Sequence, residues 1–208
     1  MRRAEKLSRA EQKALRPLQI LDAAFEEFVA RGFSATRLED IAQRVGVTKG
    51  TIYVYFPTKE DLFSATIRHI SKPLEDLLRD SKDVSGNYSE KICNMIILFY
   101  ERISCDRHSR ELIRLVISEG SRFPSVVADH HDELIAPLLG LTQAVIDEGV
   151  AAGEFRDAPA ALASVVVAPV IANMIETLIF GQPRADDVPA YIRAHVDLVL
   201  NGLAVTRS

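Results

Sequence analysis

The stretch from Leu38 to Lys59 constrains the fold of this chain most strongly, because it predicts two short helices joined by a tight turn. In the first helix one apolar face recurs at helical spacing, formed by Leu38, Ile41, Ala42 and Val45. Gly46 is a residue type that commonly ends a helix, and Thr48 is placed to cap the next one. Pro57 ends the second helix, because the residue before a proline is driven out of the helical region. The pattern describes a helix-turn-helix.

The second predicted helix, Lys49 to Phe56, is rich in tyrosine and begins with a lysine. An ordinary helical hairpin has the same spacing, so spacing alone leaves both interpretations open. Tyrosine and threonine hydroxyls, a lysine ammonium and the N–H groups at a helix N-terminus all donate hydrogen bonds to phosphate oxygens. The composition therefore favours a helix that lies on DNA.

Residues from about Arg16 to Ile70 resemble the DNA-binding domain of the TetR family of transcriptional regulators. The matching segments keep their order and spacing, and they are Ile20–Phe25, Gly32-Phe33, Asp40–Ala42, Gly46–Tyr53, Tyr55-Phe56 and Lys59–Phe63. This match covers about a quarter of the chain. One departure is Arg37, where many relatives have a second threonine.

The resemblance implies an all-α fold, with a three-helix head for DNA and a body of about six helices for ligand binding and dimerisation. We therefore divide the chain into three parts. Residues 1–15 are expected to form a basic, flexible arm, which is either a frayed terminus or a tail that touches DNA. Residues 16–70 are expected to form the head, and residues 71–208 the body.

The second helix of the motif should enter the major groove of DNA. Lys49 and Gly50 are the expected contacts to base edges, since lysine suits guanine O6 and N7. The expected phosphate contacts are Thr36, Thr48, Thr51, Tyr53, Tyr55 and Lys59. Arg37 could reach a phosphate as well, although Arg37 and Arg44 also fit solvated charges. Thr36 and Glu39 have the spacing of a capping box, as do Thr58 and Asp61.

The net charge of −4 conceals an uneven distribution. Residues 1–59 hold 11 Lys and Arg against 7 Asp and Glu, whereas residues 60–208 hold 14 against 22. A polyanion would attract the first part and repel the second, so the molecule should dock on DNA by one end. A solvated surface can produce the same division by chance.

Seven further helices or helical regions are expected from the spacing of apolar residues. Their approximate ranges are 17–31, 59–79 with a kink at Pro73, 88–105, 107–119, 125–152, 157–180 and 188–203. In the first of them, Glu27 is expected to face water. The segment from Ala160 to Phe180 is nearly apolar all round and so must be buried on most sides. A central core helix would satisfy this, but the resemblance implies that the last two helices pair with their copies in a homodimer.

The resemblance also implies a pocket for a small-molecule effector in the body. The residues that we expect to line it are Asn94, Phe99, His131 and Met174, with His130 and Glu176 as further possibilities. The function expected is a repressor that an effector releases from a palindromic operator. The alternative is a DNA-binding factor without a sensory ligand, constitutively bound or architectural.

Enzyme, metal and membrane functions find little support in the sequence. No G-x-S-x-G, H-E-x-x-H or glycine-rich phosphate loop occurs, and adjacent His130 and His131 leave a helix about 100° apart, too divergent to share one metal. We therefore expect no catalytic residue, metal or cofactor. Cys93 and Cys105 read as buried, reduced thiols. Without a long uncharged apolar run or a secretory signal, we expect no membrane span and a cytoplasmic protein.

Overall fold

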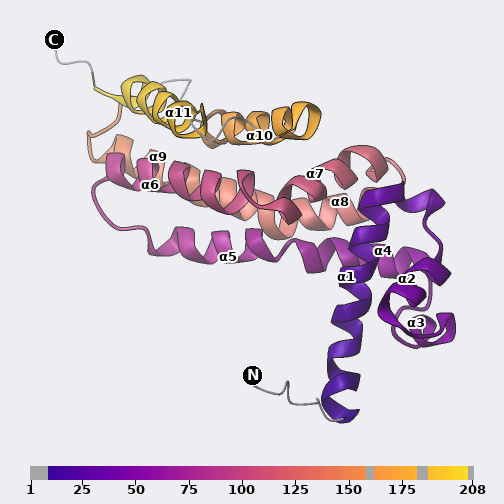
Figure 1. Ribbon diagram of the computed structural model, residues 1–208. Helices are drawn as coiled ribbons and strands as arrows, with labels where there is room; N and C mark the ends of the chain where they lie inside the picture. The colour runs from indigo at the N-terminus through magenta and orange to yellow at the C-terminus, as the bar shows by residue number, and fades with distance from the viewer. Residues whose placement is uncertain (1–8, 158–161, 182–186, 206–208) are drawn as a thin grey trace, which may run out of the picture.

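The computed structural model describes residues 9–157, 162–181 and 187–205, and within these ranges the chain is helical (Figure 1). The all-α prediction is confirmed. A single isolated bridge joins Phe155 and Ala204.

Residues 9–70 hold four helices: α1 (Arg9–Ala35), α2 (Leu38–Val45) and α3 (Lys49–Tyr55), which are the three expected of the head, and α4 (Lys59–Ile70), which follows them. α2 and α3 follow the predicted motif. α1 begins at Arg9 instead of near Pro17, so residues 9–15 of the expected arm are helical, while residues 1–8 lie outside the described residues. Pro17 lies inside α1, and Gly32 has a φ of 74° that breaks its regular helix before the end at Ala35.

The body follows from Lys72 onward. Its elements are α5 (Lys72–Asp80), the 3₁₀ turn η1 (Ser81–Asp83), α6 (Tyr88–Phe99), the π-helical turn η2 (Tyr100–Ser104), α7 (Arg107–Glu119), α8 (Pro124–His130), the π-helical turn η3 (His131–Ile135), α9 (Ala136–Ala151), α10 (Ala163–Phe180) and α11 (Asp187–Leu203). The single helix expected over 59–79 is instead two helices separated at Ser71, with Pro73 in the first turn of α5. A proline lacks the N–H that a helix interior needs, so the break precedes it.

The buried residues form two clusters. The head cluster includes Ile20, Phe28, Ile41, Ile52 and Phe63, and it also takes in Leu112 and Leu115 from α7. The body cluster gathers around α6, α9 and α10, with Met95, Phe99, Tyr100 and Met174 fully buried. α7 thus contributes to the core of the head although it belongs to the body. α3 and the pair α10–α11 lie at opposite ends of the molecule (Figure 1).

Two helical stretches, Pro124–Ala151 and Ala163–Phe180, are long and apolar enough to cross a membrane by length and composition alone. The expectation that no apolar stretch is long enough to span a membrane is therefore wrong. Core helices of soluble proteins also pass that test, and here α9 packs against α6 and α10 within the body. Both stretches lie in the body, and 22% and 39% of their most apolar windows are buried within the chain.

Candidate nucleic-acid interface and ligand cavity

The turn between α2 and α3 is built by Gly46 and Thr48. Gly46 adopts the left-handed conformation (φ 74°, ψ 39°), and the Val47 N–H donates to the carbonyl of Ala42 at 2.9 Å, which closes the end of α2. The Thr48 hydroxyl accepts from the N–H of Thr51 at 3.2 Å, as expected of an N-cap. Ile52 is fully buried in the head core, so it fixes which side of α3 faces outward.

The outward side of α3 carries most of the predicted DNA contacts. Thr48, Lys49, Gly50 and Tyr53 are exposed, and Thr51 and Tyr55 are half-buried. Val54 is 80% exposed on the same helix and was not among the expected contacts. Its position two residues after buried Ile52 could have identified it, because such residues point to different sides of a helix. An exposed apolar side chain here suits contact with a thymine methyl group.

Lys49 is held by an ion pair in the absence of DNA. Its ammonium lies 2.7 Å from the Glu39 carboxylate and 5.7 Å from the centre of the Tyr53 ring. The hydrogen bond to Glu39 raises the pKa of Lys49, and the same bond lowers the pKa of Glu39. Because both side chains are exposed, DNA can replace Glu39 as the partner of Lys49 at small cost.

Thr36 is not placed for a phosphate contact. Its side chain is 2% exposed, and its hydroxyl donates to the carbonyls of Glu27 (3.0 Å) and Gly32 (2.7 Å), which ties down the end of α1. The capping box expected from Thr36 and Glu39 is also wrong, since α2 has exposed Arg37 as its N-cap and no side-chain cap. The second expected capping box is confirmed, with Thr58 and Asp61 at the start of α4.

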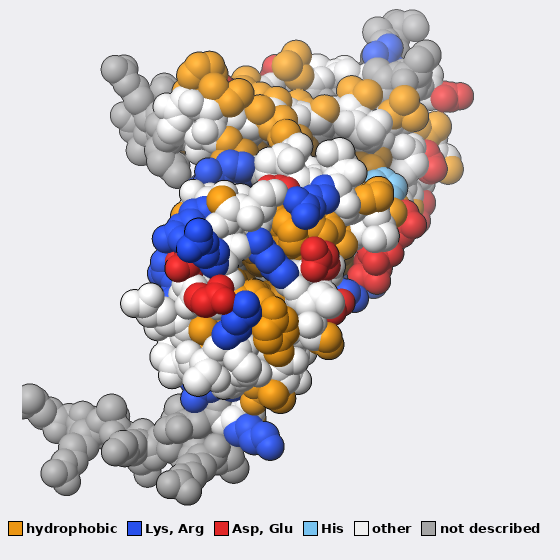
Figure 2. Space-filling view, turned by 90° about the vertical axis from the view of Figure 1, so that its right-hand side faces the viewer, with side chains coloured by type: hydrophobic (Ala, Val, Ile, Leu, Met, Phe, Trp, Pro, Cys, Tyr) orange, Lys and Arg blue, Asp and Glu red, His pale blue; other side chains and the backbone are white. Residues whose placement is uncertain are grey.

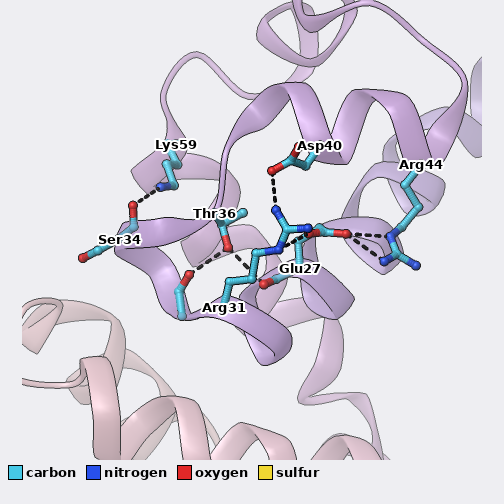
Figure 3. Close-up of polar contacts among 8 residues, drawn as sticks. Glu27, Arg31, Ser34, Thr36, Asp40, Arg44 and Lys59 are labelled. Carbon is cyan, nitrogen blue, oxygen red and sulfur yellow. Dashed lines mark hydrogen bonds and ion pairs between the residues drawn. The ribbon is translucent and has the colours of Figure 1, made fainter.

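A buried carboxylate joins α1 to α2 (Figure 3). Glu27 is 4% exposed rather than facing water, and its Oε1 accepts from Nε and Nη2 of Arg44 at 3.0 and 2.7 Å. Arg31 lies 3.4 Å from the other carboxylate oxygen and also pairs with Asp40 at 2.6 Å. Arg44 is therefore a structural cation of the head and not simply a solvated charge. This network fixes α2, and with it α3, against α1.

Lys59 lies half-buried at the first turn of α4. Its ammonium is 3.4 Å from the carbonyl oxygen of Ser34 and 4.5 Å from the centre of the Phe33 ring (Figure 3). Burial lowers its pKa, and the positive charge of Arg122 lowers it further. Lys and Arg side chains gather on the face of the molecule that Figure 2 shows, and acidic side chains lie among them.

The body contains a cavity of about 220 Å³. It is lined by Leu74, Ile103, Ser109, Leu112, Ile113, His130, Ile135, Leu138, Leu139, Ser164, Val167, Ala168, Ile171 and Met174. Of the four residues expected to line the pocket, Met174 alone lies in this lining. Asn94 is exposed on α6, and Phe99 is buried in the body core. His131 is exposed and bonded to Asp132 at 3.0 Å, so its neighbour His130 takes the place expected of it.

A larger hollow of about 640 Å³ lies on the head, between α1 and the end of α2. It is open to solvent and lined by side chains of both charge signs, including Arg16, Asp22, Glu26 and Arg44. An open, mixed-charge hollow lacks the enclosure and apolar lining of a small-molecule site.

α7 connects the body cavity to the head. It lines the cavity with Ser109, Leu112 and Ile113. At its C-terminal end, a Glu119 carboxylate oxygen accepts from the N–H of Phe33 at 3.0 Å, and in the turn that follows Arg122 donates to the Ser34 hydroxyl at 2.9 Å. These contacts reach the end of α1, after its break at Gly32, and the spacing of apolar residues gives no signal for them.

α10 and α11 leave apolar side chains uncovered. The exposed ones include Leu162, Val165, Ile175, Ile179, Phe180, Tyr191 and Leu198. Between the two helices lies a further hollow of about 230 Å³, lined by Val165, Pro169, Leu198 and neighbouring residues. Large exposed apolar side chains gathered on two helices are typical of an interaction surface.

The two cysteines carry no disulfide. Cys93 is half-buried and Cys105 is exposed, so the expectation of two buried thiols is wrong for Cys105. Within residues 9–157, 162–181 and 187–205, no group of three or more His, Cys, Asp or Glu side chains is arranged to hold a metal ion.

Two family models match the chain. Residues 20–66 match "Bacterial regulatory proteins, tetR family", and residues 95–202 match "AefR-like transcriptional repressor, C-terminal domain". Among curated relatives, the fatty acid metabolism regulator protein of Bacillus subtilis is 23% identical over 194 residues, covering 92% of this chain and 97% of that protein. RutR of Escherichia coli K12 is 49% identical over 51 residues, or 24% of each chain.

Solved structures with a similar fold include two bound to small molecules. FadR from Bacillus subtilis in complex with stearoyl-CoA superposes with a TM-score of 0.70 at 20% identity, covering 89% of this chain and 98% of that one. A regulator from Saccharomonospora viridis in complex with choline gives a TM-score of 0.74 at 20% identity, covering 92% and 99%.

Proposed function

Because this chain belongs to the TetR family of DNA-binding transcriptional regulators, we propose that it is a homodimeric repressor that a small molecule releases from a palindromic operator. The family is one of regulators and not of enzymes, and its members act on DNA with small molecules as effectors. We place its action in the cytoplasm, where the operator lies.

The observation that carries the proposal is the outward side of α3, described above. Lys49 and Gly50 contact base edges, with Gly50 letting the backbone approach closely, and Val54 joins them as an apolar contact. Thr48, Thr51, Tyr53, Tyr55, Arg37 and Lys59 donate to phosphates and fix the register. The inward-turned hydroxyl of Thr36 has no part in this set.

Dimerisation through α10 and α11 follows from their uncovered apolar side chains. The pair lies at the end of the molecule opposite α3, so a dimer formed there leaves both heads free (Figure 1). Two heads spaced by about 34–36 Å, or a multiple of it, read the two halves of a palindrome.

Release by an effector is supported by α7, because this helix both lines the cavity and contacts the head. A ligand that fills the cavity displaces side chains of α7, and Glu119 passes a shift of that helix to the backbone of Phe33. His130, another cavity residue, lies 3.2 Å from Ser71 at the break between α4 and α5. A tenfold change in operator occupancy requires about 1.4 kcal/mol of difference in ligand affinity between the two states.

The test of base reading is a selection of bound sequences from a random duplex pool, carried out with the wild type and with Lys49→Ala. We expect the wild type to enrich a palindrome and the variant to enrich it with relaxed preference at one position in each half. The loss of discrimination there should be about 1–3 kcal/mol.

Tyr53→Phe provides the control, because loss of a phosphate contact weakens all sequences alike. Equal losses on the enriched palindrome and on random DNA for Lys49→Ala would refute the base-reading role. Enrichment of no palindrome by the wild type would refute the proposed operator.

A further inference from the structure

The walls of the body cavity are mostly apolar, unlike those of a site for a charged ligand. The residues that line it are aliphatic apart from Ser109, His130, Ser164 and the Met174 thioether. The described lining contains neither a charged side chain at neutral pH nor an aromatic ring of Phe, Tyr or Trp. A charged group moved into this space loses its hydration without gaining a partner, and a quaternary ammonium finds no aromatic face.

Ser109 supplies the polar anchor. Its side chain is 1% exposed, and its hydroxyl has no hydrogen-bond partner among the described residues. Its backbone N–H is already satisfied by Asp106 at 2.7 Å, so only the hydroxyl is left unmatched. Buried hydroxyls are rarely left without a partner, because the loss of hydration is uncompensated. A ligand oxygen in the cavity provides the missing partner.

His130 adds a hydrogen-bond acceptor. The Ser71 hydroxyl donates its proton to the carbonyl of Ile67 at 2.7 Å, so the contact of 3.2 Å between Ser71 and His130 places the proton on Nδ1 of the imidazole. Burial lowers the pKa of His130, and the ring is therefore neutral at neutral pH, with an unprotonated Nε2. Ser109 and His130 thus each add a polar group to an otherwise apolar lining, one a hydroxyl and the other a neutral ring.

The volume limits the size of the ligand. A dry, apolar cavity of about 150 Å³ holds benzene, so the 220 Å³ here corresponds to roughly nine non-hydrogen atoms. A long acyl chain exceeds this space. A charged head group left at the margin of the cavity meets exposed Ser164 and Ala168 and no cationic side chain of the lining.

We infer that the effector of this protein is a neutral, predominantly apolar alcohol of about nine non-hydrogen atoms, anchored through its hydroxyl at Ser109. This inference rests on the proposed release by a ligand in the body cavity. It also separates this chain from the two similar structures, whose ligands carry charge.

The test is isothermal titration of the full chain with 1-octanol, octanoate, octanoyl-CoA and choline. We expect saturable binding of 1-octanol and much weaker binding of the three charged molecules. Ser109→Ala should weaken 1-octanol binding by roughly three- to tenfold, which corresponds to one hydrogen bond. Propylbenzene has the same number of non-hydrogen atoms but no hydroxyl, so it should bind the wild type and the variant equally.

Ser118→Ala is the matched control, because Ser118 lies on the same helix, outside the cavity, and bonds only to the carbonyl of Leu115. It should leave the affinity for 1-octanol unchanged. Tighter binding of any charged molecule, or no effect of Ser109→Ala on 1-octanol, would overturn the inference.

A parallel titration of the protein–operator complex separates this inference from the proposed function. If 1-octanol binds in the cavity but leaves the operator occupied, the inferred ligand class stands and release by the cavity is refuted. If octanoyl-CoA or choline frees the operator while 1-octanol does not bind, release stands and the ligand class is refuted.

Discussion

The double substitution Ile179→Glu and Phe180→Glu is expected to convert the proposed dimer to a monomer of 23.1 kDa in light scattering at micromolar concentration. The two side chains are 65% and 80% exposed in the single chain, at the end of α10. A carboxylate buried between two apolar faces loses its hydration without a partner, so the association fails. Affinity for a full palindrome should then fall about a hundredfold or more, because the second head no longer binds intramolecularly.

Affinity for an isolated half-site should be unchanged, since α3 is far from α10 (Figure 1). Ile117→Glu serves as the control, because Ile117 is 69% exposed on α7 and lies outside the α10–α11 surface. The control should remain a dimer. A doubly substituted protein that is still dimeric would place the interface elsewhere.

The substitution Phe33→Ala is expected to lower the free energy of unfolding by about 3–5 kcal/mol, as measured by urea denaturation. The Phe33 ring is buried, and its centre lies 5.3 Å from that of Phe63 and 4.7 Å from that of Phe123. The cations of Lys59 and Arg122 each lie 4.5 Å from the ring centre. The ring therefore joins α1, α4 and the turn after α7.

Phe33→Leu is the matched control, because it retains most of the buried volume and should cost less than about 1.5 kcal/mol. Ser34→Ala removes the exposed bond to Arg122 and should cost less than about 1 kcal/mol. If Phe33→Ala cost less than about 1 kcal/mol, the Phe33 ring would not be what holds the head to the body.

The helices of the head were predictable because their signals are local. The apolar spacing of α2, the glycine after it and the cap at Thr48 lie within a few residues of one another, and all act as expected. Local spacing gave the wrong result for Thr36. Its spacing to Glu39 fits a capping box, but in the fold its hydroxyl donates to the Gly32 carbonyl at the end of α1. The expectation that Glu27 faces water was wrong for a similar reason. A charged side chain is buried only where an opposite charge pairs with it, and the partner of Glu27 is Arg44, 17 residues away in the sequence.

The ligand cavity was hardly predictable from the sequence. Its walls come from α5, α7, α8, α9, α10 and the π-helical turns η2 and η3, and no periodicity shows which helices face one another. His131 was expected to line the cavity, but His130 does so instead. The π-helical turn His131–Ile135 changes the rotation of the helix by about one residue, and the sequence gives no sign of it. Met174 was identified because it belongs to an unusually apolar helix that had to be buried.

The most direct measurement of the central claim is the salt dependence of binding between the wild-type protein and duplex DNA from upstream of its own coding sequence, followed by fluorescence anisotropy. If Arg37, Lys49 and Lys59 of both heads neutralise phosphates, the affinity should fall on the order of a thousandfold between about 50 and about 200 mM salt. Lys59→Ala should reduce the slope of log affinity against log salt by about one. Absence of salt-dependent binding to every duplex, the upstream fragment included, would contradict the account.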